Sequence, residues 1–287
     1  MNQSSVLIKG VRLYGEGDPV DVLVTDGQIA EIGTGLVADL DLVEVIDAEG
    51  QVLLPGFVDL HTHLREPGKE EAETIESGSN AAALGGYTAV LAMPNTTPTM
   101  DCAAVVQQVL DLGRDAPCDV YASGAITVDR AGEQLAPMAE MAALGVRLFT
   151  DDGAGVQSNA MMRRAMEYAV GLGVTLAQHC EDDAMANGGH MHEGEWSARL
   201  GIAGQPSETE ELMVMRDIAL ARMTGARVHF LHLSTAGSVA MVAAAWAEVS
   251  GSSTANSSQP KRESRSSCER TLRRRLATAM ISASPAA

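Results

Sequence analysis

Short apolar runs alternate with helical segments from Gly56 onward, and this alternation constrains the fold more than any other feature of the sequence. The expected strands are 57–63, 87–93, 119–126, 146–150, 174–179 and 227–233. The expected helices lie near 74–84, 101–113, 133–144, 159–172 and 207–224. Strand–helix alternation is typical of a parallel sheet covered by helices. The predicted fold class is therefore α/β, an incomplete TIM-type barrel with about six of the eight units of a closed barrel.

The two ends of the chain differ from this central region. Residues 1–54 contain short strands and turns, with a hairpin signal at Asp26-Gly27, and predict a small N-terminal β unit. Residues 55–250 are expected to form the partial barrel. Residues 251–287 contain nine Ser, seven Lys or Arg and two Asp or Glu. This basic, Ser- and Arg-rich tail is expected to be disordered or to come from an out-of-frame reading.

The net charge of −18 argues against nucleic acid and anionic membrane surfaces as partners, because both are bound by clustered Lys and Arg. No stretch approaches the ~20 apolar residues of a membrane helix. The N-terminal residues, MNQSSVLIKG, lack the pattern of a signal peptide. We therefore expect a cytoplasmic protein.

A His-X-His pair ends the first expected barrel strand. His61 and His63 follow the apolar run FVDL, and side chains two apart on a strand face the same side. The carboxyl ends of barrel strands are where active sites lie. Two such imidazoles, about 6–7 Å apart along the strand, can bind one divalent metal ion. Taken alone, the pair would fit two polar core histidines equally well.

Three further strands end in residues that can bind a metal. Asp152 follows the fourth strand, with Asp151 as the alternative, and His179 and His232 close the fifth and sixth. Four histidines and a bridging carboxylate suit two metal ions. A bridging lysine is excluded because the only lysines, Lys9, Lys69 and Lys261, are not at a strand end.

Three other histidines are expected to have different environments. His229 lies three residues before His232, so a regular strand would turn it to the opposite face. His190 and His192 lie in a Gly-rich loop and are expected to be solvated.

The segments HTHLREPG, AMPNT, FTDDG, AQHCED, HEGEWS and HLST together resemble dihydroorotase of the bacterial type with a bridging aspartate, within the amidohydrolase superfamily. The resemblance covers roughly residues 5–245. It implies two zinc ions, bound by His61 with His63 and by His179 with His232, and bridged by Asp152. It also implies reversible hydrolysis of dihydroorotate to N-carbamoyl-aspartate in pyrimidine biosynthesis.

The same resemblance implies that His63, Arg65 and Asn95 bind the small-molecule substrate. An arginine offers two parallel donors to a carboxylate, and an asparagine just past a strand end can donate to the same oxygens. The structural alternatives are a surface salt bridge from Arg65 to Glu66 or Glu70, and a turn-forming role for Asn95.

The family pattern is not followed after Ala247. An Asn-Pro-Pro loop and an eighth strand ending in Asp-His-Ala-Pro-His are expected there and are absent. That aspartate would be the catalytic acid and base, so the resemblance implies an impaired enzyme or a product without a stable fold. A non-catalytic scaffold for aspartate transcarbamoylase is the alternative function, and a homodimer or that enzyme is the expected partner. Allantoinase and dihydropyrimidinase are disfavoured because the bridging lysine is absent.

Overall fold

The computed structural model describes residues 5–37 and 43–252. The chain divides into two compact units, 1–57 and 58–287. Most of the predicted tail, from residue 253 on, lies outside the described residues, so its character stays a prediction.

The N-terminal unit is a β-sheet of five strands. The strands are β1 Ser5–Leu13, β2 Val20–Thr25, β3 Gln28–Gly33, β4 Val43–Asp47 and β5 Val52–Leu53. Their order is β3-β2-β1-β4, and β5 pairs with a further part of β1. The hairpin predicted at Asp26-Gly27 is confirmed, because both residues have positive φ and connect the antiparallel strands β2 and β3.

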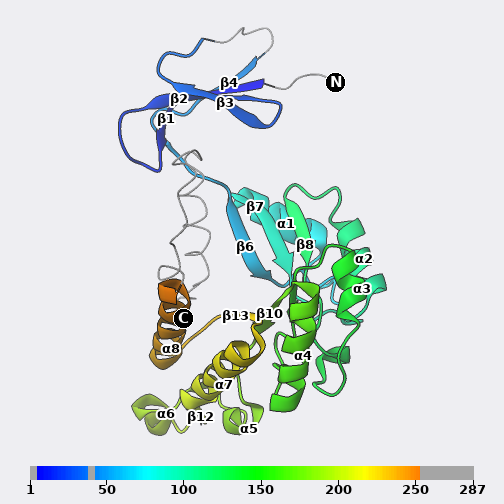
Figure 1. The fold of residues 1–287 in the computed structure, drawn as a ribbon. Coiled ribbons are helices and arrows are strands. Elements are labelled where there is room, and N and C mark those ends of the chain that lie inside the picture. Colours follow the sequence, from blue (N-terminus) through cyan, green and yellow to red (C-terminus); the bar gives the residue numbers. More distant parts are fainter. Residues whose placement is uncertain (1–4, 38–42, 253–287) are drawn as a thin grey trace. The chain divides into compact units, whose positions relative to one another are not determined.

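Six strands and the helices between them build the second unit. The strands are β6 Phe57–Thr62, β7 Tyr87–Ala92, β8 Asp119–Ala122, β9 Leu148–Thr150, β10 Thr175–Gln178 and β13 Arg227–Phe230. They form two three-stranded sheets, β6-β7-β8 and β13-β10-β9 (Figure 1). One parallel bridge, between Gly124 and Phe149, connects the two sheets. All six predicted strands are present, each somewhat shorter than predicted.

The five predicted helices are also present. They are α1 Ile75–Leu84, α2 Ala103–Leu112, α3 Met138–Ala143, α4 Asn159–Leu172 and α7 Glu208–Thr224. The structure adds a 3-10 turn at Val128–Arg130, α5 Asp183–Ala186, β11 Met191–His192, α6 Glu195–Leu200, β12 Gly204–Gln205 and α8 Ala236–Ser252. The short elements contain too few residues for a period to show in the sequence. Helix α8 is apolar on nearly all sides, so its sequence lacks the contrast between two faces.

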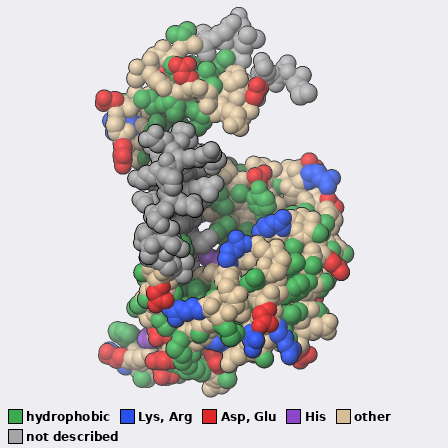
Figure 2. All heavy atoms as spheres, viewed as in Figure 1, with side chains coloured by type: hydrophobic (Ala, Val, Ile, Leu, Met, Phe, Trp, Pro, Cys, Tyr) green, Lys and Arg blue, Asp and Glu red, His purple; other side chains and the backbone are tan. Residues whose placement is uncertain are grey.

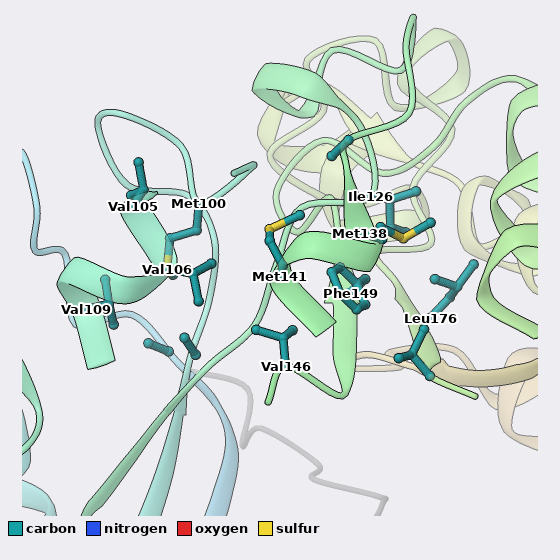
Figure 3. Packing of buried hydrophobic residues seen from close by; sticks show 14 of the residues in the cluster. Met100, Val105, Val106, Val109, Ile126, Met138, Met141, Val146, Phe149 and Leu176 are labelled. Carbon is teal, nitrogen blue, oxygen red and sulfur yellow. The ribbon is translucent and has the colours of Figure 1, made fainter. Parts of the chain in front are cut away.

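The main core of this unit lies between the sheets and helices α2, α3 and α4. Phe149 is fully buried in the middle of this cluster, with Met141 and Val146 to one side and Leu176 to the other (Figure 3). Gly124 permits the close contact between the two sheets, because a Cβ atom there would lie 2.6 Å from the Phe149 ring. The core therefore fixes the ends of β8 and β9 relative to each other.

The sheet does not close into a barrel within the described residues. β6 and β13 each pair with one neighbouring strand only and are the outer strands of the two sheets. None of the helices in the described part has the length and apolarity that a membrane crossing requires. On the face drawn in Figure 2, basic and acidic side chains are interspersed.

Candidate metal centre

Five side chains from four strands converge at one edge of the second unit. His61 lies in β6 and His63 just after it, whereas Asp152, His179 and His232 each follow the end of β9, β10 or β13. Neighbouring parallel strands bring their carboxyl ends to the same edge, which explains how residues far apart in sequence meet. The sequence-predicted metal ligands therefore lie together.

The carboxylate of Asp152 lies at the centre of the four imidazoles. Its Oδ1 is 3.5 Å from His61 Nε2, 3.7 Å from His179 Nδ1 and 3.4 Å from His232 Nε2. Its Oδ2 is 3.6 Å from His63 Nε2. The ring nitrogens also approach in pairs, 3.2 Å apart for His61 and His63 and 3.0 Å apart for His179 and His232. The ligand atoms thus form two groups that share Asp152, and within each group they lie within 4.8 Å of one another.

The chemistry of these donors fits a metal ion. Imidazole nitrogens and a carboxylate are the ligands that zinc and similar divalent ions use. Burial would raise the pKa of Asp152, but hydrogen bonds with His179, His232 and His61 outweigh it and lower this pKa, so the carboxylate is charged. His61 Nδ1 is buried with no hydrogen-bond partner in the described residues. A positive charge between these groups would compensate such crowding of polar atoms.

Asn95 fixes the orientation of one of the imidazoles. His63 Nδ1 lies 3.0 Å from Asn95 Oδ1. An amide oxygen can only accept, so Nδ1 is the donor and Nε2 keeps its lone pair for the side of Asp152. Outer partners of this kind orient a metal-binding histidine. The Asn95 side chain therefore does more than form a turn, which was the structural alternative.

The substitution Asn95→Ala is expected to weaken zinc binding at the His63 side of the cluster by about 10–100-fold, because the ring loses its orienting acceptor. Competition with a chromophoric chelator measures this affinity. Asn80→Ala, on the exposed face of α1, is the matched control and should bind zinc as the unchanged chain does. Equal zinc affinity of the two variants would contradict the role of Asn95.

Asp151 and Asp152 have separate roles in the structure. The Asp151 carboxylate is fully buried and accepts hydrogen bonds from the Ile126 N–H at 2.8 Å, the Thr127 N–H at 3.0 Å and the Thr127 hydroxyl. Burial raises its pKa, and these hydrogen bonds act in the opposite direction. Asp151 therefore holds the loop after β9 against the loop after β8, while Asp152 faces the histidines.

Arg65 lies two residues beyond His63 and is half-buried with a positive φ of 63°. Burial lowers the pKa of His63, and the nearby Arg65 charge acts in the same direction. Glu66 and Glu70 do not pair with Arg65: their carboxylates accept from the backbone N–H groups of Ile75 and Gly68. The predicted substrate role of Arg65 stays a prediction, but the structural alternative of a salt bridge is absent from the described contacts.

The prediction that His229 faces away from the cluster is wrong. Its neighbour Phe230 packs on the helix side, against Met213 and Val214, so alternation turns His229 to the inner side of the sheet. The prediction assumed that the alternation of a regular strand continues from His229 to His232. It does not, because β13 ends at Phe230 and His232 has a φ of 29°. His229 nevertheless belongs to neither of the two ligand groups in the described part.

A cavity of about 540 Å³ adjoins the cluster. His179 and His232 line one part of it, and His190, His192 and Glu210 line another. His190 and His192 are exposed, as predicted, but His192 belongs to strand β11 and not to a loop. Their place beside this cavity was missed, because nothing in the sequence indicates that β11 and β12 pair next to the ends of β10 and β13.

Comparisons with known proteins agree with this geometry. The family model described as dihydro-orotase-like matches residues 50–238. The chain is 56% identical over 250 residues to a dihydroorotase of Mycobacterium tuberculosis, and 48% identical over 252 residues to one of Streptomyces coelicolor. These matches cover 86% of this chain but only 57% and 58% of the relatives, so the chain spans little more than half their length.

Solved structures show the same fold. The L-hydantoinase of Arthrobacter aurescens matches with a TM-score of 0.70 and 23% identity, over 85% of this chain and 56% of that enzyme. A D-hydantoinase matches with a TM-score of 0.67 and 22% identity. The fold is thus the α/β amidohydrolase fold, matched over part of its length. Since the family model spans more than half of the residues and four of the motifs supply the histidine–aspartate cluster, the chain belongs to the dihydroorotase-like family.

Proposed function

We propose that this chain carries the zinc-binding part of a dihydroorotase, which interconverts dihydroorotate and N-carbamoyl-aspartate. The observation that carries the proposal is the convergence of four imidazoles on Asp152 in a chain 56% identical to a dihydroorotase. The hydantoinases share the fold at lower identity, so they support the architecture only. The proposed substrate rests on the dihydroorotases, to which the chain is more similar.

In this proposal one zinc ion binds to His61 and His63, a second binds to His179 and His232, and Asp152 binds both. Zinc ions bound there would polarise the ring carbonyl and provide a water nucleophile at neutral pH. The lowered pKa of Asp152 keeps its two oxygens free of protons for this bridging position.

The substrate carboxylate is proposed to bind to Arg65 and Asn95 beside His63. A guanidinium group donates two parallel hydrogen bonds to a carboxylate. The Asn95 oxygen already accepts from His63, so the amide nitrogen is the atom of Asn95 that would donate to the substrate. This arrangement would hold the ring next to the zinc ions with its carboxylate directed away from them.

We further propose that the chain alone turns over slowly. Asp152 is the single carboxylate in the two ligand groups of the described residues, and four imidazoles surround it. If it bridges two zinc ions, Asp152 would not be free to move a proton between water and the ring nitrogen. The loss of general acid–base catalysis lowers the rate by about 10²–10⁴-fold. A non-catalytic scaffold for aspartate transcarbamoylase is less well supported, because a scaffold needs none of the five convergent side chains.

Metal analysis combined with a substrate panel tests the proposal. The purified chain is loaded with zinc, dialysed, and assayed by chromatography for opening of dihydroorotate, hydantoin and allantoin. The expected result is about two zinc ions per chain and slow opening of dihydroorotate alone, which stops on chelation. Fewer than ~0.2 ions per chain would contradict the metal centre. Opening of hydantoin or allantoin instead would contradict the substrate.

A further inference from the structure

A strained turn in the loop after β8 places an arginine beside the candidate metal centre. Asp129 and Arg130 are consecutive residues with φ values of 54° and 57°, in the left-handed region. Residues other than glycine rarely adopt this conformation, because the Cβ atom then lies too close to the backbone. Two such residues in succession cost free energy that other contacts must offset. Backbone strain of this kind is found most often at functional sites.

Two hydrogen bonds hold this turn in place. The backbone N–H of Asp129 donates to Asp101 Oδ2 at 2.8 Å, which ties the turn to the segment before α2. The side chain of Arg130 makes the other bond, in which Nη1 donates to the backbone carbonyl of Asp152 at 2.7 Å. The strained turn is therefore connected directly to the residue at the centre of the four imidazoles.

The guanidinium group of Arg130 has few other partners. Its Nε atom is buried and has no hydrogen-bond partner among the described residues. Five other arginines form ion pairs with carboxylates in the described part of the chain, whereas Arg130 forms none there. A half-buried cation without a carboxylate partner costs free energy, because water would solvate it better. The contact with Asp152 is thus the interaction that accounts for the position of this side chain.

The backbone around Asp152 is held on both sides. On its amino side, the buried side chain of Asp151 is bound to the loop after β8. On its carboxyl side, Arg130 holds the Asp152 carbonyl oxygen, and the planar peptide bond extends this constraint to Gly153. Gly153 continues the chain with a φ of 82°, which glycine adopts readily. The Asp152 carboxylate can then change direction only by rotation about its side-chain bonds.

We propose that Arg130 is a positioning residue that directs the Asp152 carboxylate to its place between the two zinc ions. This inference rests on the proposed function, in which Asp152 binds both ions. A bridge between ions about 3.5–4 Å apart needs one oxygen near each ion, so a rotated backbone would favour one ion over the other. Asn95 lies close by, since a Cβ atom on Gly153 would be 3.6 Å from Arg130 Nη1 and 3.8 Å from Asn95 Nδ2.

Two variants of Arg130 test the proposal. Arg130→Met removes the donor and keeps a long side chain, whereas Arg130→Lys keeps one cationic donor. In the metal-free chain, the amides of Ala154 and Gly155, which donate to the Asp151 carbonyl, should exchange about tenfold faster in the methionine variant. Its dissociation constant for zinc should rise by about 10–100-fold. The lysine variant should recover most of both properties. Arg164→Met, at an exposed position on α4, is the matched control and should behave as the unchanged chain does.

Cobalt in place of zinc separates positioning from a general loss of structure. A variant that only folds less well would bind fewer Co²⁺ ions, with the same visible absorption for each bound ion. Displacement of the bridging carboxylate would change that absorption, because it depends on the coordination geometry. We expect the absorption for each bound ion to change in Arg130→Met and to return towards that of the unchanged chain in Arg130→Lys.

Three results would overturn the role of Arg130. The first is equal exchange at Ala154 and Gly155 in Arg130→Met and Arg164→Met. The second is equal zinc affinity of these two variants. The third is an unchanged cobalt spectrum together with faster exchange throughout α4. If the unchanged chain itself bound no zinc, the proposed function would be contradicted and this inference with it, whereas equal affinities in chains that do bind zinc would contradict the role of Arg130 alone.

Discussion

Replacing Asp152 by alanine is expected to abolish zinc binding at both halves of the cluster. Asp152 is the one carboxylate that the two ligand groups share. Without it, two cations about 3.5–4 Å apart would lose the negative charge between them, and neutral imidazoles alone would not offset their repulsion. We expect zinc content to fall below ~0.2 ions per chain after dialysis, and opening of dihydroorotate to fall by at least about 10³-fold.

Elemental analysis and the chromatographic assay measure these two effects. Asp115→Ala provides the control, because it removes a carboxylate from an exposed position away from the cluster. Circular dichroism establishes that the variant remains folded before its zinc content is compared. If Asp152→Ala kept as much zinc as the control, the histidines would bind the metal without a bridge, and the proposed centre would be wrong.

Replacing Asp151 by alanine should have the second largest effect, on folding rather than on metal. The variant leaves two backbone N–H groups and one hydroxyl group without acceptors in a fully buried position. Each unsatisfied buried group costs about 1–3 kcal/mol, so the free energy of unfolding should fall by roughly 3 kcal/mol or more. Urea denaturation measures this loss.

Two further variants separate the contributions at Asp151. Asp151→Asn keeps an oxygen that accepts from Ile126 and Thr127, and its amide group can donate to the Thr127 hydroxyl. It should therefore be much less destabilised than the alanine variant. Thr127→Val removes a single hydroxyl group and should cost about 1 kcal/mol. Unfolding of all three variants at the same urea concentration as the unchanged chain would show that the hydrogen bonds to Asp151 do not contribute to stability.

The sequence predicted the six strands and the approximate place of the cluster for one physical reason. Parallel strands bring their carboxyl ends to one edge, so residues that follow them, such as His179 and His232, must meet there. The choice between Asp151 and Asp152 could not be made in advance. The directions of neighbouring side chains in a short turn depend on the contacts of the loop. Here the hydrogen bond from the Thr127 hydroxyl fixes the direction of the Asp151 side chain.

Other features could not be predicted because they depend on where regular structure ends. Alternation predicted the wrong face for His229, since β13 stops at Phe230 and the backbone turns before His232. The cavity beside His190 and His192 depends on a pairing of two-residue strands that carries no sequence signal.

The division of the second unit into two sheets has a mechanical consequence for any bound cation. His61 and His63 belong to the β6-β7-β8 sheet, whereas His179 and His232 follow strands of the β13-β10-β9 sheet. The Gly124–Phe149 bridge and the hydrogen bonds from Ile126 and Thr127 to Asp151 already connect the two sheets, and the cluster is a further place where they can be connected. Zinc ions held by histidines of both sheets would stabilise the junction between the sheets. Because they would bind only the folded chain, the melting temperature would rise with the concentration of free zinc.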